Sequence, residues 1–268
     1  SAGGTISFAI ECYENGILTR EDTDGLELSW GNPEAVIKLL DMMGNREGIG
    51  DVLADGVKVA AEKIGRGSEQ FAMHIGGQEL PMHDPKLNPE YHATYKLDPT
   101  PGRHTQYEGN KRIGTIPDRP ANPRDYAGRG EHHKAASEYM QVVNAGGMCQ
   151  FIMICANTAN IPTWFNAVTG WDMDVNEVMA IGERITNLRM AYEVREGGNP
   201  RQRNVPSRVT GATTEATHIG PLEGVNLDTE LLETDFLKAS GWDVDTCTPS
   251  KAKLESVGLA DVAATLHR

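Results

Sequence analysis

The chain turns at Asn144-Ala145-Gly146-Gly147-Met148-Cys149-Gln150-Phe151, where two consecutive glycines interrupt a helical pattern of apolar residues. Glycine reaches positive φ and lets a ligand approach the backbone closely, so we expect a bend at a helix end here. A cysteine just after such a bend lies beside unpaired backbone groups, which can stabilise a thiolate or a bound group. On this stretch alone a small buried core residue is the favoured interpretation, because that is the commoner fate of a lone cysteine.

A second stretch, Asp22-Thr23-Asp24-Gly25-Leu26-Glu27, has the same spacing of a polar residue, a glycine, an apolar residue and a residue able to bind. The alignment pairs Asp22 with Asn144, Gly25 with Gly147, Leu26 with Met148 and Glu27 with Cys149. Asp22 also stands three residues after Thr19, the spacing of a capping pair, so a purely structural role is the alternative for it. The sequence therefore contains two similar bends far apart in the chain.

The two stretches resemble the paired Asp-x-x-Gly-Leu-(Cys or Asp) loops of the aldehyde:ferredoxin oxidoreductase family, tungsten enzymes built on a bis-pterin cofactor. Further segments are similar to that family and follow its order: Gly16–Asp22, Arg46–Gly48 through Ala61–Gly65, Ala72–His74, Thr169–Asp172, Ile181–Leu188 and Val194–Gly197. Many matches in the right order are far more specific than either short loop. The resemblance extends over nearly the whole chain.

The resemblance implies a tungsten (or molybdenum) bis-pyranopterin and a [4Fe–4S] cluster. It assigns pterin contacts to Asp22, Gly25, Leu26, Glu27, Gln106, Asn144, Gly147 and Met148. A carboxylate suits the ring because it accepts hydrogen bonds from coplanar N–H donors. Asn144 departs from the usual aspartate, and its amide can donate as well as accept. Cys149 would be the fourth thiolate of the cluster, while the Cys-x-x-Cys-x-x-x-Cys run that supplies the other three is absent from this sequence.

Arg103-His104-Thr105-Gln106 matches the position of the family's active-site histidine. Taken alone, a loop histidine is as readily a structural side chain as a functional one. With the resemblance, we predict that His104 transfers a proton or polarises the substrate carbonyl. Gln106 stands where the family often has a basic residue touching the cofactor. Weaker candidates, which this match does not support, are His74, His83, His92, His132 and His133.

Composition excludes several classes of function. The formal charge of −13 over 268 residues argues against a nucleic-acid surface, and no apolar run approaches the length of a membrane span. The cysteines, Cys12, Cys149, Cys155 and Cys247, lack the spacing of a zinc site or a disulfide framework, so we expect a reducing cytoplasm. Because the chain opens at Ser1 without an initiating methionine, we expect a fragment that corresponds to the family's second and third domains.

The periodicity predicts a mostly α, multihelical fold of two packed helical subdomains, 1–80 and 81–268, with long irregular loops and few short strands. The first would carry one pterin loop, and the second would carry the other loop and the cluster cysteine. Helices are expected over 5–15, 33–43, 50–64, 131–145, 161–169, 174–196, 229–240 and 249–257, a short strand over 71–75, and irregular segments over 80–129 and 198–224.

Three helical details carry structural predictions. In the helix over 33–43 we expect one inward face to hold Val36, Ile37, Leu39, Leu40 and Met43. The helix from 174 should begin with a capping box of Asp174 and Glu177. Its inward residues should include Ile185, Leu188 and Tyr192, and Gly182, which weakens a helix interior, should mark close packing.

The resemblance implies that the intact protein oxidises a small aldehyde to a carboxylic acid with water and passes two electrons through the cluster to ferredoxin, while the isolated fragment is inactive. Other subunits or a second copy could complete the assembly. One alternative is the tungsten subunit of an aryl-CoA reductase of the benzoyl-CoA type. Another is a non-catalytic helical module that binds a partner chain.

Overall fold

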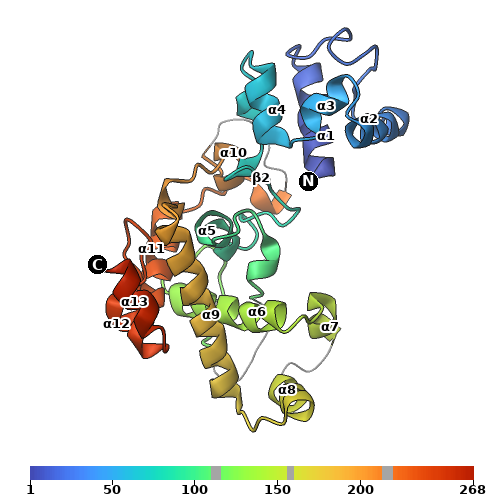
Figure 1. Ribbon diagram of the computed structural model, residues 1–268. Coiled ribbons are helices and arrows are strands. Elements are labelled where there is room, and N and C mark those ends of the chain that lie inside the picture. The colour runs from blue at the N-terminus through green and yellow to red at the C-terminus, as the bar shows by residue number, and fades with distance from the viewer. Residues whose placement is uncertain (110–115, 156–159, 213–219) are drawn as a thin grey trace. The chain divides into compact units, whose positions relative to one another are not determined.

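The computed structural model describes residues 1–109, 116–155, 160–212 and 220–268, and it is mostly α-helical, as the periodicity predicted (Figure 1). The chain forms two compact units, one of residues 1–82 with 204–206 and one of residues 83–203 with 207–268. No helix in the described ranges is both long enough and apolar enough to cross a membrane.

The first unit is a set of short helices followed by a small hairpin. Its elements are α1 (Ala2–Glu14), α2 (Pro33–Asn45), α3 (Ile49–Leu53), α4 (Val57–Ile64), the 3₁₀ turn η1 (Ser68–Phe71), β1 (His74–Ile75) and β2 (Gln78–Glu79). The strands pair antiparallel, with His74 opposite Glu79. The strand expected over 71–75 is confirmed only at its end, because Phe71 belongs to the preceding 3₁₀ turn.

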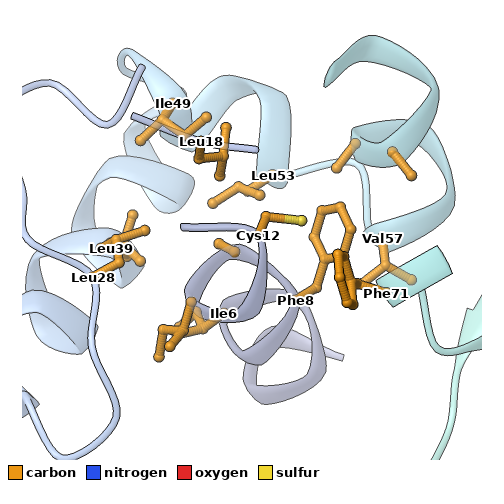
Figure 2. Close-up of a cluster of buried hydrophobic side chains, with 14 of the residues drawn as sticks. Ile6, Phe8, Cys12, Leu18, Leu28, Leu39, Ile49, Leu53, Val57 and Phe71 are labelled. Carbon is orange, nitrogen blue, oxygen red and sulfur yellow. The ribbon is translucent and has the colours of Figure 1, made fainter. Parts of the chain in front are cut away.

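Apolar side chains from α1 to η1 meet in one core (Figure 2). Phe8 and Cys12 of α1 lie in it together with Leu53 and Phe71, and all four are buried. Burial raises the pKa of the Cys12 thiol to about 12, because a thiolate would lose its hydration there. Cys12 is therefore a packing residue.

Two expectations for this unit are wrong in part. The helix expected over 50–64 is two helices, because Gly56 adopts φ +86° between them and the backbone N–H of Val57 donates to the Glu79 carboxylate at 2.8 Å. On α2, Asn32 caps the first turn as its position before Pro33 predicted. However, Ile37 and Leu40 are 61% and 45% exposed, so the buried face is narrower than the apolar pattern.

The second unit contains the longer helices. Its elements are α5 (Glu90–Leu97), η2 (His104–Gln106), α6 (Gly130–Ala145), α7 (Gln150–Cys155), α8 (Ile161–Thr169), α9 (Val175–Arg195), η4 (Pro200–Gln202), α10 (Ser207–Thr210), η5 (Gly220–Leu222), α11 (Thr229–Ser240), α12 (Lys251–Ser256) and α13 (Ala260–Leu266). The predicted helices over 131–145, 161–169, 174–196 and 229–240 are confirmed. α5 and α13 were not predicted.

α6 is the central helix of this unit and packs against α9 and α11 (Figure 1). A Cβ added at Gly182 of α9 would stand 2.2 Å from the Glu138 carbonyl oxygen of α6, which confirms the close packing expected at this glycine. The capping box of Asp174 and Glu177 is present, but Leu188 and Tyr192, which were expected to face inward, are exposed. At the N-terminal end of α6, the backbone N–H groups of Arg129 and Gly130 donate to the Asp235 carboxylate of α11.

α5 was missed because it has no amphipathic stripe: nearly every one of its side chains is buried, including polar ones. The Glu233 carboxylate of α11 accepts hydrogen bonds from His92 at 2.7 Å and Lys96 at 2.8 Å, and it also pairs with Arg201. Burial opposes the charge on Glu233, but these bonds outweigh it and lower its pKa to about 2. Polar pairing therefore holds α5 in the core.

Candidate functional site

Side-chain hydrogen bonds stabilise the first bend, which contains Asp22 and Gly25. The backbone N–H and the hydroxyl of Thr19 both donate to the Asp22 carboxylate at 2.8 Å, as the capping alternative predicted. Arg66 adds a bidentate pair at 3.1 Å, and its hydrogen bonds with those of Thr19 hold the Asp22 pKa well below its usual range. Asp22 therefore already has partners within the first unit.

The backbone of this bend follows the Schellman pattern of a helix end. Gly25 N–H donates to the Arg20 carbonyl and Asp24 N–H to the Glu21 carbonyl, with φ +55° at Asp24 and +84° at Gly25. No atom lies within 4 Å of a Cβ added at Gly25, so the backbone there is open. Leu26 is partly buried in the core, whereas the exposed Glu27 carboxylate has no partner among the described residues.

The second bend has the same pattern in a register shifted by one residue. Met148 N–H donates to the Val143 carbonyl and Gly147 N–H to the Asn144 carbonyl, so the left-handed residue is Gly147 at φ +68°. In the first bend the corresponding residue of the Schellman pattern is Asp24. The alignment of the two stretches pairs Asp24 with Gly146, not with Gly147, so the two bends differ by one residue. Gly147 is exposed with open space beside it, and Met148 packs partly into the core of α6, α8 and α9.

The η2 turn is attached to this second bend by two amides. The Asn144 side-chain amide donates to the Thr105 carbonyl at 3.2 Å, and the Gln141 amide donates to the buried Gln106 side-chain oxygen at 2.9 Å. The structure thus brings His104 and Gln106, on one segment, to the C-terminal end of α6, where Asn144 and Gly147 lie. The Asn144 amide can donate this hydrogen bond to the Thr105 carbonyl, which a carboxylate could not do.

His104 is half-buried, and its ring lies at a tilt against that of another histidine. Its ring centroid lies 4.7 Å from that of His83, which is exposed, and His83 in turn stacks on Tyr91 at 5.7 Å. Desolvation by burial, and then the neighbouring His83, lower the pKa of His104 below its ordinary value. His104 is therefore a neutral imidazole near pH 7 and can accept a proton.

The cysteines divide into two buried and two exposed thiols. Cys149, next to the bend, and Cys155, at the end of α7, are exposed, whereas Cys12 and Cys247 are buried. Burial raises the pKa of Cys247 to about 11, so it resembles Cys12. Among the described residues no three His, Cys, Asp or Glu side chains gather closely enough to hold a metal ion. The described part of the chain offers Cys149 as a single accessible thiol beside the bend.

An apolar groove of about 170 Å³ borders the other side of the second bend. Its lining residues are Val142, Ala145, Gly146, Phe165, Trp171, Met173, Val178, Ile181 and Ile185. Of the predicted site residues none lines this groove. A polar heterocycle would find few hydrogen-bond partners in it, so we do not assign it to the predicted site.

Within the second unit the structure brings His104 and Gln106 to Asn144 and Gly147. Arg66, Gln141 and the contact of His83 with His104 were not predicted from the sequence. Gln141 is three residues from Asn144, so helical periodicity predicts that both lie on one side of α6. Arg66 and His83 reach their partners across 44 and 21 residues (66 − 22 and 104 − 83), and no local pattern signals such contacts.

Comparison with known proteins extends the picture. Residues 1–259 match the family described as aldehyde ferredoxin oxidoreductase, domains 2 and 3. A tungsten-containing aldehyde ferredoxin oxidoreductase of Pyrococcus horikoshii is 30% identical over 97% of this chain and 43% of its own length. The WOR-like subunit of an aliphatic sulfonate oxidoreductase of Pyrococcus furiosus is 37% identical over 39% of this chain and 18% of its own length.

A solved structure has the same fold. It is the active site complex BamBC of benzoyl coenzyme A reductase with 1,5-dienoyl-CoA, and it aligns with a TM-score of 0.71 and 25% identity over 99% of this chain and 44% of that chain. The chain spans less than half the length of this solved structure and less than half the length of the Pyrococcus horikoshii relative. From the match over residues 1–259, the chain belongs to the aldehyde ferredoxin oxidoreductase family and corresponds to its domains 2 and 3.

Proposed function

We propose that this chain is the C-terminal part of a tungsten (or molybdenum) oxidoreductase that converts an aldehyde and water to a carboxylic acid. The electrons would leave through a [4Fe–4S] cluster to ferredoxin. The observation that carries the proposal is the attachment of the η2 turn, with His104, to the glycine bend at the end of α6. The tungsten-containing relatives that align over 97% of the chain support it.

The residues of the two bends suit a flat polar heterocycle. Gly25 and Gly147 have positive φ and open space, so a ring can approach either backbone. The Glu27 carboxylate and the Oδ1 atom of Asn144 are acceptors that no other described residue occupies, and both residues are exposed. These groups would hold a pyranopterin, which supplies the metal centre for two-electron chemistry when bound. Asp22 would act with Arg66 rather than as a free carboxylate.

Leu26 and Met148 would contribute their backbone only, because their side chains pack inward. The Gln106 side-chain oxygen is already bonded to Gln141, so this residue would orient η2. The exposed thiol of Cys149 would provide one cluster ligand. Since one thiolate cannot hold a four-iron cluster, the 268-residue chain alone is expected to be inactive.

His104 would accept the proton of the attacking water. Its neutral imidazole accepts a proton at a ring nitrogen, and neither ring nitrogen is engaged by another described residue. A group whose pKa lies below the working pH is ready to act as a base without first losing a proton.

The test is metal analysis combined with two substitutions in the holoenzyme. We expect tungsten or molybdenum together with iron, and iron alone would refute the pterin site. Cys149→Ser should abolish or convert the cluster signal in electron paramagnetic resonance, and Cys155→Ser is the matched control. His104→Ala should slow aldehyde turnover by about a hundredfold with unchanged metal content, and normal turnover would remove His104 from the chemistry.

The structural match to a benzoyl coenzyme A reductase complex favours a second candidate, an aryl-CoA reductase subunit. The two candidates differ in substrate and in the direction of electron flow. Assaying the holoenzyme with aldehydes and an oxidised acceptor, and with an aromatic acyl-CoA and a reduced donor, separates them.

A further inference from the structure

His83 is held in one orientation although it is exposed. Its ring lies between Tyr91 at 5.7 Å and His104 at 4.7 Å, with interplanar angles of 27° and 42°. Its backbone carbonyl accepts a hydrogen bond of 2.8 Å from the hydroxyl of Tyr95, a residue that is only 1% exposed. A surface histidine usually moves freely, so these contacts show that the fold holds this ring against His104.

The surroundings leave His83 as the titratable side chain that acts on His104. From α6 the side chains that contact the η2 segment are the uncharged amides of Gln141 and Asn144. From α5 the nearest ring is Tyr91, which stacks on His83. On the two segments themselves, Arg103 is exposed and the Asp84 carboxylate is paired with Lys86 at 3.1 Å.

We propose that His83 fixes the imidazole of His104 and carries protons between that imidazole and solvent. The inference rests on the proposed function, in which each aldehyde and water yield a carboxylic acid, two electrons and two protons. One proton would pass from the attacking water to a ring nitrogen of His104, then through a water molecule to a ring nitrogen of His83, and then to bulk solvent. No other bond forms or breaks in this transfer.

The geometry suits a relay of two rings. His104 is only partly exposed, whereas His83 is exposed and its ring centroid lies 4.7 Å from that of His104. The two rings are tilted by 42° and do not hydrogen-bond to each other, so a water must link their nitrogens. Burial, and then the neighbouring His83, disfavour the charged form of His104 and lower its pKa.

Two substitutions separate positioning from proton transfer. His83→Phe keeps an aromatic ring against His104 but cannot carry a proton, and His83→Ala removes both. His267→Phe is the matched control, because His267 is another exposed histidine of the second unit and stacks on no described ring. All three can be made in the 268-residue chain and in the holoenzyme.

In the 268-residue chain, NMR titration of the His104 ring is the first readout. With His83→Phe its pKa should rise by about half a unit, because the neighbouring charge is lost. With His83→Ala it should rise further, because the ring becomes hydrated. His267→Phe should leave it unchanged. A His104 titration that is identical in all four proteins would overturn the inference.

In the holoenzyme, turnover is the second readout. His83→Phe and His83→Ala should slow turnover by about tenfold, within the range of a proton-transfer contribution, and added imidazole buffer should restore it by carrying the proton. Slow turnover that no buffer restores would overturn the relay. If aldehydes are not substrates but the His104 titration responds as stated, the proposed function fails and the His83–His104 coupling stands.

Discussion

Asn144 shows how one contact decides which side chain a position accepts. The family resemblance favours aspartate there, but the Asn144 amide nitrogen donates to the Thr105 carbonyl at 3.2 Å. A carboxylate in the same place would set two acceptors against each other. The asparagine therefore suits the attachment of η2 to α6.

Asn144→Asp should destabilise the second unit. The change removes one hydrogen bond and adds repulsion between acceptors, so we expect a loss of about 1 kcal/mol in the free energy of unfolding. Asn144→Ala, which removes the bond without repulsion, should lose less. Urea denaturation of the three proteins measures the difference, and an aspartate variant as stable as the parent would contradict it.

His133 gives the chain a pH-dependent stability. It is buried, hydrogen-bonded to Thr94 at 2.8 Å, and its pKa falls to about 3, first through desolvation and then through His132 and His92. Between pH 6.5 and 3 the unfolded chain binds a proton that the folded chain does not, so stability falls as pH decreases through that window. Stability that did not change in this window would show that His133 becomes charged without unfolding.

The contribution can be isolated by substitution. His133→Phe removes the titration while keeping a ring beside Phe236, whose centroid is 4.2 Å away. At pH 7 the variant should be less stable than the parent, because packing and one hydrogen bond change. At pH 4 the difference should shift in favour of the variant by about 3 kcal/mol. Urea denaturation at the two pH values measures this shift.

The contact of α6 with α9 depends on the absence of one side chain. A Cβ at Gly182 would stand 2.2 Å from the Glu138 carbonyl oxygen and 2.8 Å from its carbon, and backbone atoms of a helix cannot move aside cheaply. The glycine therefore allows the two helices to approach closely, although it weakens α9 by itself.

Gly182→Ala should destabilise the protein, although alanine in place of glycine usually stabilises a helix. Alanine normally stabilises a helix interior by up to about 1 kcal/mol, but here overpacking should cost about 1–3 kcal/mol. Gly44→Ala is the control, because Gly44 lies in α2 with no atom within 4 Å of its added Cβ. Thermal or urea unfolding of both variants should give opposite signs, and a stabilised Gly182→Ala variant would contradict the close contact.

The two compact units each present one glycine bend, with Gly25 in the first unit and Gly147 in the second. Their shared Schellman pattern is also a common way to end a helix, so the resemblance of the bends alone does not require a ligand. The metal content of variants at each bend distinguishes a bend that binds a cofactor from one that only ends a helix.

Gly25→Asn and Gly147→Asn test each bend separately. Asparagine tolerates positive φ, so the backbone is kept while the open space is filled. Each change should lower the tungsten or molybdenum content of the holoenzyme by about tenfold. Gly170→Asn, at an equally open glycine with φ +74°, is the control.

Unchanged metal content in both variants would remove the bends from cofactor binding. Metal analysis of the purified proteins supplies the measurement.

Local patterns predicted much of the fold. Capping residues located α2 and α9, and apolar periodicity located α6, α8 and α11. The failures have nonlocal causes. α5 is buried by ion pairs with α11, the helix over 50–64 is broken where Glu79 bonds to Val57, and Ile37 is exposed although its neighbours are apolar.

For the candidate site, the sequence proposed residues but not their partners. The alignment of two short stretches predicted Asp22, Gly25, Asn144, Gly147 and Cys149 as site residues, and this stays a prediction. It did not predict the one-residue shift between the bends, because that depends on which residue enters the left-handed region.

What the sequence determined by itself is the family, the helical class and the two glycine bends, because helix periodicity, caps and backbone freedom act between residues near in the chain. Only the tertiary structure decided that Arg66 pairs with Asp22, that Asn144 holds the segment of His104, and that the ring of His83 lies against that of His104. Those contacts join residues 21 to 44 positions apart. They exist because the folded core fixes where each segment lies, and no local preference encodes that.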